Sequence, residues 1–368
     1  MKWRIWPIVA AAVLIGASLS VFLLSLTEGP QDIYQITTMT VRYDVVVTNG
    51  GPGEAESIPL TVAFMRDSEP NQHVKAIEAF PAPNRTYSDT LNNSFAVFTI
   101  ERLHAGQNWT ATFTATVELK SMDINLHPRS AGTYRGEEDT FLAPTALADS
   151  NNPAVVAKAR ALESPSGDLT ETVWNIYNFI IDRIAYQQLP GEWSASWVLT
   201  HGEGGSAEFG NTFVALARAS GIPARRISGW GEPFNISEMR TANRFSHGWA
   251  EFYFPAYGWV PVDPTWGRTH RFDNLGRPDD QHIVMTKGEG IHFFNRGAFF
   301  SPGNDAAVTT DYRVTTLAKT NVTTSAEHMI VLGFLYGLPL LFLAVVAHKV
   351  WVIRKESGRA GPDEREGG

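Results

Sequence analysis

Two long apolar segments near the ends of the chain restrict where the rest of it can fold. Residues 5–26 carry no charge and follow two basic residues, and residues 329–347 carry no charge and precede several more. About 20 apolar residues span the hydrocarbon core of a bilayer as a helix. Basic residues flank both segments on their outer sides, which favours cytoplasmic termini. The sequence therefore predicts a two-pass protein of the cell membrane, in contact with the lipid bilayer, with residues 28–327 outside.

Each segment has an alternative interpretation. A cleaved signal peptide would have a shorter apolar region and a small-residue cleavage site, and no clean A-x-A pattern closes the first segment. The second segment could instead be a buried helix. Five N-x-S/T glycosylation sequons lie in the predicted outside region and agree with this topology. They are at Asn84, Asn92, Asn108, Asn235 and Asn321.

Composition excludes several classes of function. The net charge is −8, and no run of Lys and Arg occurs over the predicted folded region, so we expect no nucleic-acid partner. The chain has no cysteine, which excludes disulfides, thiolate metal sites and thiol catalysis. The sequence contains neither a phosphate loop nor a dinucleotide fingerprint, and its histidines show no zinc-ligand spacing. We therefore expect neither a cofactor nor a metal.

The pattern of apolar residues changes twice along the outside region. Residues 33–120 alternate as strands do, with Gly, Pro and Asn turns between them, and predict an all-β sandwich. Helical spacing begins near Pro153, and the period returns to two after Pro223. Helices followed by an antiparallel sheet predict a domain of the α+β class.

The predicted organisation has seven parts. They are an N-terminal transmembrane signal anchor (1–27), the sandwich (28–120), a connector (121–152), the α+β domain (153–300), an outside tail (301–327), a C-terminal transmembrane helix (328–353) and a charged cytoplasmic tail (354–368). Because the connector is long and irregular, we expect the sandwich and the α+β domain to fold separately.

Three residues of the α+β domain together suggest chemistry. Ser206 stands at the start of a helix, where a serine can cap the helix or act as a nucleophile favoured by the helix N-terminus. His247 opens the first strand of a predicted hairpin. Asp263 lies in the sequence VDPT after the second strand, where an Asp commonly makes a local turn bond. If the helix packs on the hairpin, these residues become the nucleophile, base and orienting acid of a triad.

Two sequence blocks carry a resemblance to a known family. GSAEFGNTFVALARASGIPARRISGW (205–230) and SHGWAEFYFPAYGWVPVDPTWG (246–267) resemble the transglutaminase-like core, a branch of the papain-like cysteine-protease fold. The resemblance begins near Asp168 and runs to about Gly290. It implies a papain-like domain whose chemistry is acyl transfer.

The resemblance also assigns roles to single positions. His247 and Asp263 match the catalytic base and its orienting acid. Ser206 falls on the position of the family's cysteine nucleophile, which is a departure from the family pattern. Glu208 matches a neighbouring acidic position, and Arg225 matches a structural arginine that follows the helix.

The serine decides what function the sequence predicts. A thiol beside an imidazolium at a helix N-terminus ionises, whereas a hydroxyl must lose its proton during attack. We therefore expect a catalytically impaired protein, with Ser206 still a helix cap, that binds or scaffolds a peptide or cell-surface protein ligand. An active Ser–His–Asp acyltransferase or hydrolase on peptide or isopeptide amides is the alternative. Trp249, Trp259 and Trp266 could line a ligand groove, although strand alternation favours core packing for two of them.

Overall fold

The computed structural model of this chain describes residues 31–124, 126, 136–231, 246–323, 348–351 and 355. Residues 30–322 form one compact unit, and the two ends of the chain group into another. The segments 5–26 and 329–347, which we predicted to cross the membrane, lie outside the described residues. Within the described residues, no helix is both long enough and apolar enough to cross a membrane.

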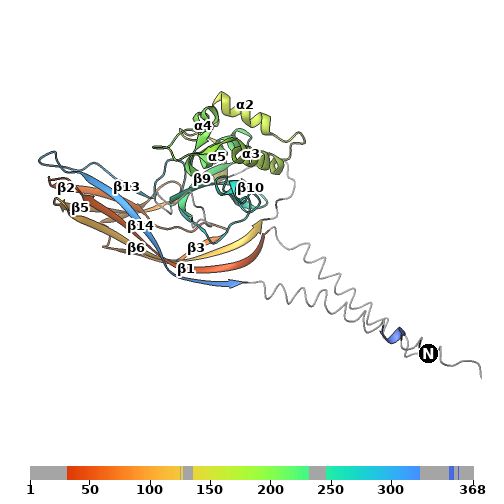
Figure 1. Cartoon of the computed structure of the whole chain (residues 1–368), viewed down its shortest axis with the longest axis horizontal. Helices are drawn as coiled ribbons and strands as arrows, with labels where there is room; N and C mark the ends of the chain where they lie inside the picture. The colour runs from red at the N-terminus through yellow and green to blue at the C-terminus, as the bar shows by residue number, and fades with distance from the viewer. Residues whose placement is uncertain are drawn as a thin grey trace, which may run out of the picture. The chain divides into compact units, whose positions relative to one another are not determined.

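Two four-stranded sheets make up the strand-rich part of the compact unit (Figure 1). One sheet has the order β14-β1-β6-β3 and the other has the order β13-β2-β5-β4. Along β6, alternate residues are buried over most of its length, as expected where one face of a sheet packs on a core. Buried residues of both sheets, among them Val41, Leu60 and Phe113, form one apolar cluster, so the two sheets make a sandwich. The strands are β1 (Gln31–Asn49), β2 (Ala55–Ala63), β3 (Gln72–Phe80), β4 (Arg85–Ser88), β5 (Ser94–Leu103), β6 (Asn108–Ile124), β13 (Phe294–Arg296) and β14 (Val308–Thr323).

Strand β14 lies in the segment 301–327, for which the sequence predicts only a tail. Gly50 N–H donates to the Ala307 carbonyl (2.9 Å), and Thr320 Oγ1 donates to the Thr38 carbonyl (3.3 Å). Residue numbers rise along β1 as they fall along β14, so the two neighbours run antiparallel. Most described side chains of β14 are exposed. Its sequence therefore lacks the strong alternation that would have predicted a strand.

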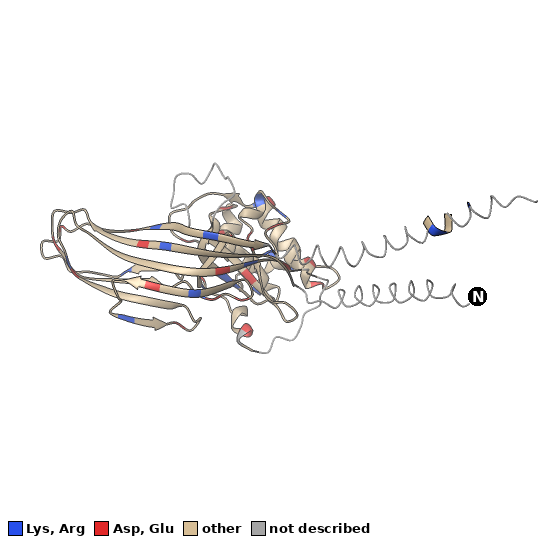
Figure 2. Ribbon diagram, turned by 90° about the horizontal axis from the view of Figure 1, so that it is seen from below, with Lys and Arg blue, Asp and Glu red and all other residues tan. Residues whose placement is uncertain are grey.

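Charged side chains of both signs are interspersed along the strands and are not gathered by sign (Figure 2). Some of them pair, as Arg42 does with Asp44 (3.1 Å) and Lys75 with Glu118 (2.5 Å). Exposed pairs of this kind contribute little to stability individually. Their distribution gives the sandwich a surface of mixed charge.

A group of helices follows the sandwich in the chain. It comprises η2 (Glu137–Leu142), α2 (Pro153–Leu162), α3 (Leu169–Arg183), α4 (Ala195–His201) and α5 (Ser206–Ala219). Side-chain caps begin two of these helices. Asn152 accepts a hydrogen bond from Ala154 N–H (3.0 Å) at the start of α2, with Pro153 in the first turn, and Asp168 accepts one from Thr170 N–H (2.9 Å) at the start of α3.

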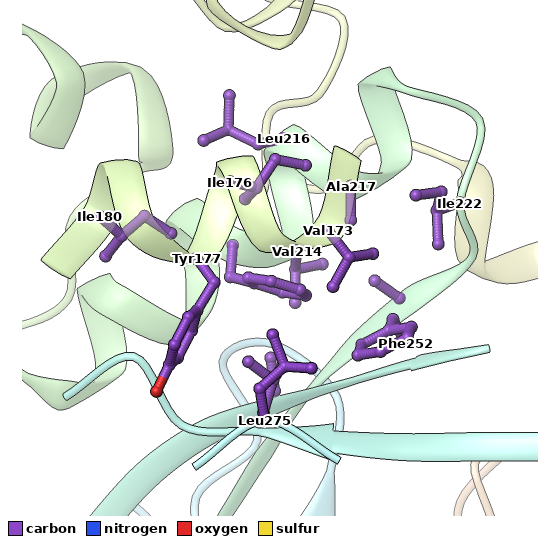
Figure 3. Packing of buried hydrophobic residues seen from close by; sticks show 14 of the residues in the cluster. Val173, Ile176, Tyr177, Ile180, Val214, Leu216, Ala217, Ile222, Phe252 and Leu275 are labelled. Atoms are coloured by element: carbon purple, nitrogen blue, oxygen red, sulfur yellow. The ribbon is translucent and has the colours of Figure 1, made fainter. Parts of the chain in front are cut away.

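A third four-stranded sheet, antiparallel and of order β11-β10-β9-β12, packs against these helices. Its strands are β9 (Ala224–Gly231), β10 (Ser246–Phe254), β11 (Gly258–Val262) and β12 (His282–Lys287), with the short pair β7 (Ala185–Tyr186) and β8 (Glu203–Gly204) and the turn η4 (Trp266–Arg268) nearby. The predicted hairpin of β10 and β11 is confirmed. The core between helices and sheet (Figure 3) includes Val173, Ile176, Tyr177, Ile180, Val214, Leu216, Ala217, Ile222, Phe252 and Leu275. This packing holds the start of α5 against the sheet.

The sandwich and the α+β part share apolar packing, although the sequence predicts that they fold separately. The Trp230 ring of β9 packs edge-on against Tyr43 of the sandwich, with ring centroids 4.8 Å apart. Ile283 and Met285 of β12 belong to the sandwich cluster, whereas Val284 between them packs with other residues. Because neighbouring strand residues face opposite sides, one face of this sheet serves the sandwich core. The whole of residues 30–322 is accordingly one compact unit.

Candidate active site

Ser206 is the first residue of α5, and its hydroxyl contacts strand β10. The residue in the cap position is Gly205, so the predicted cap role of Ser206 is wrong. Glu208 takes over that role, because its carboxylate accepts hydrogen bonds from Gly205 N–H (2.9 Å) and Trp193 N–H (3.1 Å). Ser206 Oγ accepts a hydrogen bond from Gly248 N–H (3.3 Å). The hydroxyl is thus held against β10, and its own proton remains for donation.

Glycines allow α5 and β10 to approach this closely. A Cβ on Gly248 would lie 3.2 Å from Ala207 Cα and 3.4 Å from the carbonyl carbon of Ser206. A Cβ on Gly210, further along α5, would lie 3.0 Å from the carbonyl oxygen of Trp249. Side chains at these positions would push helix and strand apart in a close-packed interior. The contact between Ser206 Oγ and β10 therefore depends on residues without side chains.

His247 and Asp263 lie together, as the sequence predicts. His247 stands near the start of β10 and Asp263 directly follows β11, and the hairpin brings His247 Nε2 within 2.7 Å of Asp263 Oδ2. Both side chains are buried. Asp263 Oδ1 meanwhile accepts hydrogen bonds from Thr265 N–H (2.8 Å) and Trp266 N–H (3.3 Å). The local turn bond and the bond to histidine are therefore both present, one on each carboxylate oxygen.

A second histidine, His282, joins this pair at the start of β12. Its Nε2 lies 3.2 Å from the same oxygen, Asp263 Oδ2. Its Nδ1 lies 2.8 Å from Asp279 Oδ1, which also accepts a hydrogen bond from His282 N–H (2.9 Å). The sequence did not distinguish His282 from the other histidines. The sequence feature that could have pointed to His282 is Asp279, three residues before it.

Comparison with known proteins identifies the family of the segment that contains the three predicted residues. The sequence model of the transglutaminase-like superfamily matches residues 156–264. Residues 156–264 are a transglutaminase-like domain. The match includes Ser206, His247 and Asp263, and ends one residue beyond Asp263.

Relatives of the transglutaminase-like domain support the fold. The solved structure of a candidate cysteine protease from Cytophaga hutchinsonii is similar, with a TM-score of 0.56 and 16% identity, over 78% of this chain and 92% of that chain. YebA of Bacillus subtilis is 41% identical over 69 residues, which are 17% of this chain and 9% of that protein. A protein-glutamine gamma-glutamyltransferase of Pseudomonas aeruginosa is 35% identical over 63 residues, 16% of this chain and 9% of that protein. The chain thus spans a small part of the length of these curated relatives.

His282 and the two carboxylates bonded to it have opposite charges at neutral pH. Burial opposes protonation of His282, but Asp279 and Asp263 outweigh it and raise the pKa of His282 to about 10. Burial likewise opposes ionisation of Asp263, but His247 and His282 outweigh it and hold the pKa of Asp263 well below its usual range. His282 is therefore a cation and Asp263 an anion.

This cluster contains the ligand types that bind zinc, two imidazoles and a carboxylate, with ligand atoms within 4.8 Å of one another. Here, however, both imidazole rings are hydrogen-bonded to Asp263 Oδ2. The arrangement is a hydrogen-bonded cluster in which one carboxylate oxygen serves both imidazole rings.

Tryptophans enclose the His247 ring. Trp249 and Trp266 are buried and stack on that ring, with centroids 5.7 Å and 4.9 Å from it. Trp259 instead lies under the guanidinium of Arg225, 3.6 Å from Arg225 Cζ. The prediction of core packing for two of the three tryptophans is confirmed. Trp249 and Trp266 together fix the orientation of the His247 imidazole.

Proposed function

We propose that the transglutaminase-like domain catalyses acyl transfer from, or hydrolysis of, peptide or isopeptide amides, with Ser206 as nucleophile. The observation that carries the proposal is the buried 2.7 Å bond between His247 and Asp263, together with the Ser206 hydroxyl bonded to the N–H of Gly248, the residue that follows His247. A base oriented by a buried carboxylate beside a nucleophile follows the logic of a catalytic triad. The Pseudomonas relative is named for transfer at protein glutamine, which is the same class of reaction.

The chemistry follows from which atoms are engaged. His247 Nε2–H donates to Asp263 Oδ2, so Nδ1 is the ring nitrogen that accepts the proton of Ser206. Ser206 Oγ then bonds to the amide carbon, the carbon–nitrogen bond breaks, and His247 returns the proton to the leaving amine. Water or a second amine attacks the resulting ester, its proton passes to His247 and then to Ser206, and the acyl group leaves. Negative charge near Oγ is favoured by the N-terminus of α5 and by Gly248 N–H.

A second candidate function is ligand binding without chemistry. It is favoured by one observation: among the described residues, no hydrogen bond joins Ser206 Oγ to the His247 ring, and Oγ bonds to Gly248 N–H instead. Even a misplacement of about 1 Å between reacting groups costs on the order of a hundredfold in rate. In this case the domain would hold a peptide or cell-surface protein ligand as a scaffold.

Labelling with a fluorophosphonate probe separates the two candidates. In the enzyme, the full chain in detergent forms a covalent adduct on Ser206, and Ser206→Ala abolishes it. Loss of the general base in His247→Ala should slow labelling by about 10²-fold or more. A wild-type chain that stays unlabelled, while binding peptides that Ser206→Ala also binds, would establish the scaffold function and sink the enzyme.

We also propose that the chain is anchored in the cell membrane by two spans, with both termini cytoplasmic and residues 28–327 outside. The uncharged segments with basic outer flanks support this topology. The region between them has strands of mixed charge, which fits a partner other than nucleic acid (Figure 2). The topology itself can be tested with protease. Protease added to intact cells should remove the outside region and spare epitope tags at both ends. A mature chain beginning near residue 27 would instead indicate a cleaved signal peptide.

A further inference from the structure

The two histidines of the site reach one carboxylate oxygen because of the strand order. Strands β10 and β12 both pair antiparallel with β9, so they are parallel to each other and begin at the same edge of the sheet. His247 is opposite Gly229 of β9, and His282 is opposite Gly231. A Cβ on Gly231 would lie 2.6 Å from the Trp266 ring and 3.3 Å from His247 Cδ2. The absence of side chains on β9 at this edge leaves room for the aromatic rings.

His282 is held in place from several sides. Asp279 binds its Nδ1 and its backbone N–H, and Asp263 binds its Nε2. The Trp266 ring packs against both imidazoles, 4.2 Å from His282 and 4.9 Å from His247 between centroids. These contacts fix the orientation of the His282 ring as strongly as that of the His247 ring.

Other charged or titratable groups lie near the two carboxylates or His282. Tyr34 interacts with Asp279 and Tyr177 with Asp263, and Glu251 and Arg277 line the same pocket as His282. Glu251 is paired with Arg225 (2.8 Å), and Arg277 is paired with carboxylates outside the cluster. The two carboxylates bonded to His282 therefore dominate its charge state.

A serine nucleophile and a cysteine nucleophile need the catalytic histidine in different protonation states before attack. A cysteine works as a thiolate beside an imidazolium, so a histidine that is readily protonated suits it. A serine must give its proton to the histidine during attack, so the imidazole has to be neutral beforehand. A carboxylate with one histidine partner favours the protonated ring, whereas a second cation on that carboxylate disfavours it.

We propose that His282 is a positioning residue whose bond to Asp263 disfavours protonation of His247 and so adapts the site to the hydroxyl of Ser206. The proposal rests on the proposed function of Ser206 as nucleophile. Its geometric basis is the sharing of Asp263 Oδ2 between the two rings, at 2.7 Å and 3.2 Å. His282 acts through Asp263 and not on substrate.

Titration of the histidine rings tests this role without relying on activity. The full chain, labelled with ¹⁵N in its histidines and held in detergent, is followed by NMR from about pH 5 to about pH 11. We expect the His282 ring to stay protonated well above neutral pH, because Asp279 and Asp263 raise its pKa. In His282→Gln, which keeps a hydrogen-bond donor but loses the charge, the His247 titration midpoint should rise by about one pH unit or more.

Two further variants keep the test decisive. Asp279→Asn removes one of the two carboxylates on His282, so the His282 midpoint should fall, even if His282→Gln does not fold. His292→Gln changes an exposed histidine and should leave the His247 midpoint unchanged. A His247 midpoint that is the same in wild type and His282→Gln, or a His282 ring that is neutral at pH 7, would overturn the proposal. Failure of fluorophosphonate labelling with the expected titrations would instead refute only the nucleophile role of Ser206.

Discussion

The hydroxyl of Ser206 lies between the N-terminus of a helix and the backbone of a strand, in surroundings that favour negative charge. Gly248 N–H already donates to it, and the His247 ring is oriented by Asp263 next to it. A thiol in this place would behave differently from a hydroxyl, because a thiol can ionise before it reacts. The nucleophilic atom therefore decides whether the group attacks as an anion or gives up its proton during attack.

We expect Ser206→Cys to create a reactive thiol. The helix N-terminus and a protonatable His247 should lower the thiol pKa from about 8.5 towards the range of about 3.5–7.5 seen for activated cysteines. Iodoacetamide should then alkylate the variant rapidly at about pH 6, as measured by mass spectrometry. Because the chain has no other cysteine, the signal is unambiguous.

The control for this variant is the double change with His247→Ala, which should slow alkylation sharply. If the thiol reacts only above about pH 8 and is indifferent to His247, the two side chains do not converge and the site assignment fails.

At the scale of elements, the site depends on the distance between α5 and β10. Two glycines, Gly210 and Gly248, line the contact, and each would bring a Cβ within 3.0–3.2 Å of backbone atoms across it. Backbone atoms in packed elements yield less readily than the end of a flexible side chain. A small change here therefore moves the nucleophile relative to its base.

We predict that Gly248→Ala separates Ser206 from His247 and slows fluorophosphonate labelling by about a hundredfold. The rate of adduct formation on the full chain measures it. The matched control is Gly50→Ala, whose Cβ would make only an ordinary contact, 3.8 Å from the Ala307 carbonyl. Equal labelling rates in the two variants would show that the close approach of helix and strand has no role.

At the scale of the whole molecule, the sandwich is part of the structure that supports the site. The β9–β12 sheet carries His247 and His282 near one edge, and one of its faces packs into the sandwich core. Trp230 links the two, since its ring contacts both Tyr43 and Phe293. The residues 30–322 should therefore unfold in one step.

We predict that Trp230→Ala lowers the free energy of unfolding by about 3–5 kcal/mol, because it leaves a cavity between sandwich and sheet. Chemical unfolding of the full chain measures the change. Leu317→Ala, at a side chain that is 55% exposed on β14, should alter stability by less than about 0.5 kcal/mol. Two separate unfolding transitions in the wild-type chain would contradict a shared core.

The sequence was informative where the pattern was local. The hairpin and the pairing of His247 with Asp263 could be predicted, because the two residues are 16 positions apart and one hairpin joins them. His282 could not, because it reaches Asp263 only through the order of strands in the finished sheet. The cap role predicted for Ser206 is wrong because Glu208 supplies it from within the helix. Trp230 looked like any apolar strand residue, and nothing local showed that it faces the sandwich.

The antiparallel pair β1 and β14 has a mechanical consequence. The compact unit begins with β1 and ends with β14, and the hydrogen-bond register puts residue 31 and residue 323 towards the same end of the pair. Tension between these two points would break the hydrogen bonds between β1 and β14 one after another, starting at that end, instead of straining all of them at once. Because β14 is an edge strand with mostly exposed side chains, it would peel away first. Force applied to the two ends of the unit would thus separate β14 from β1 before it disturbed the strands that carry the site.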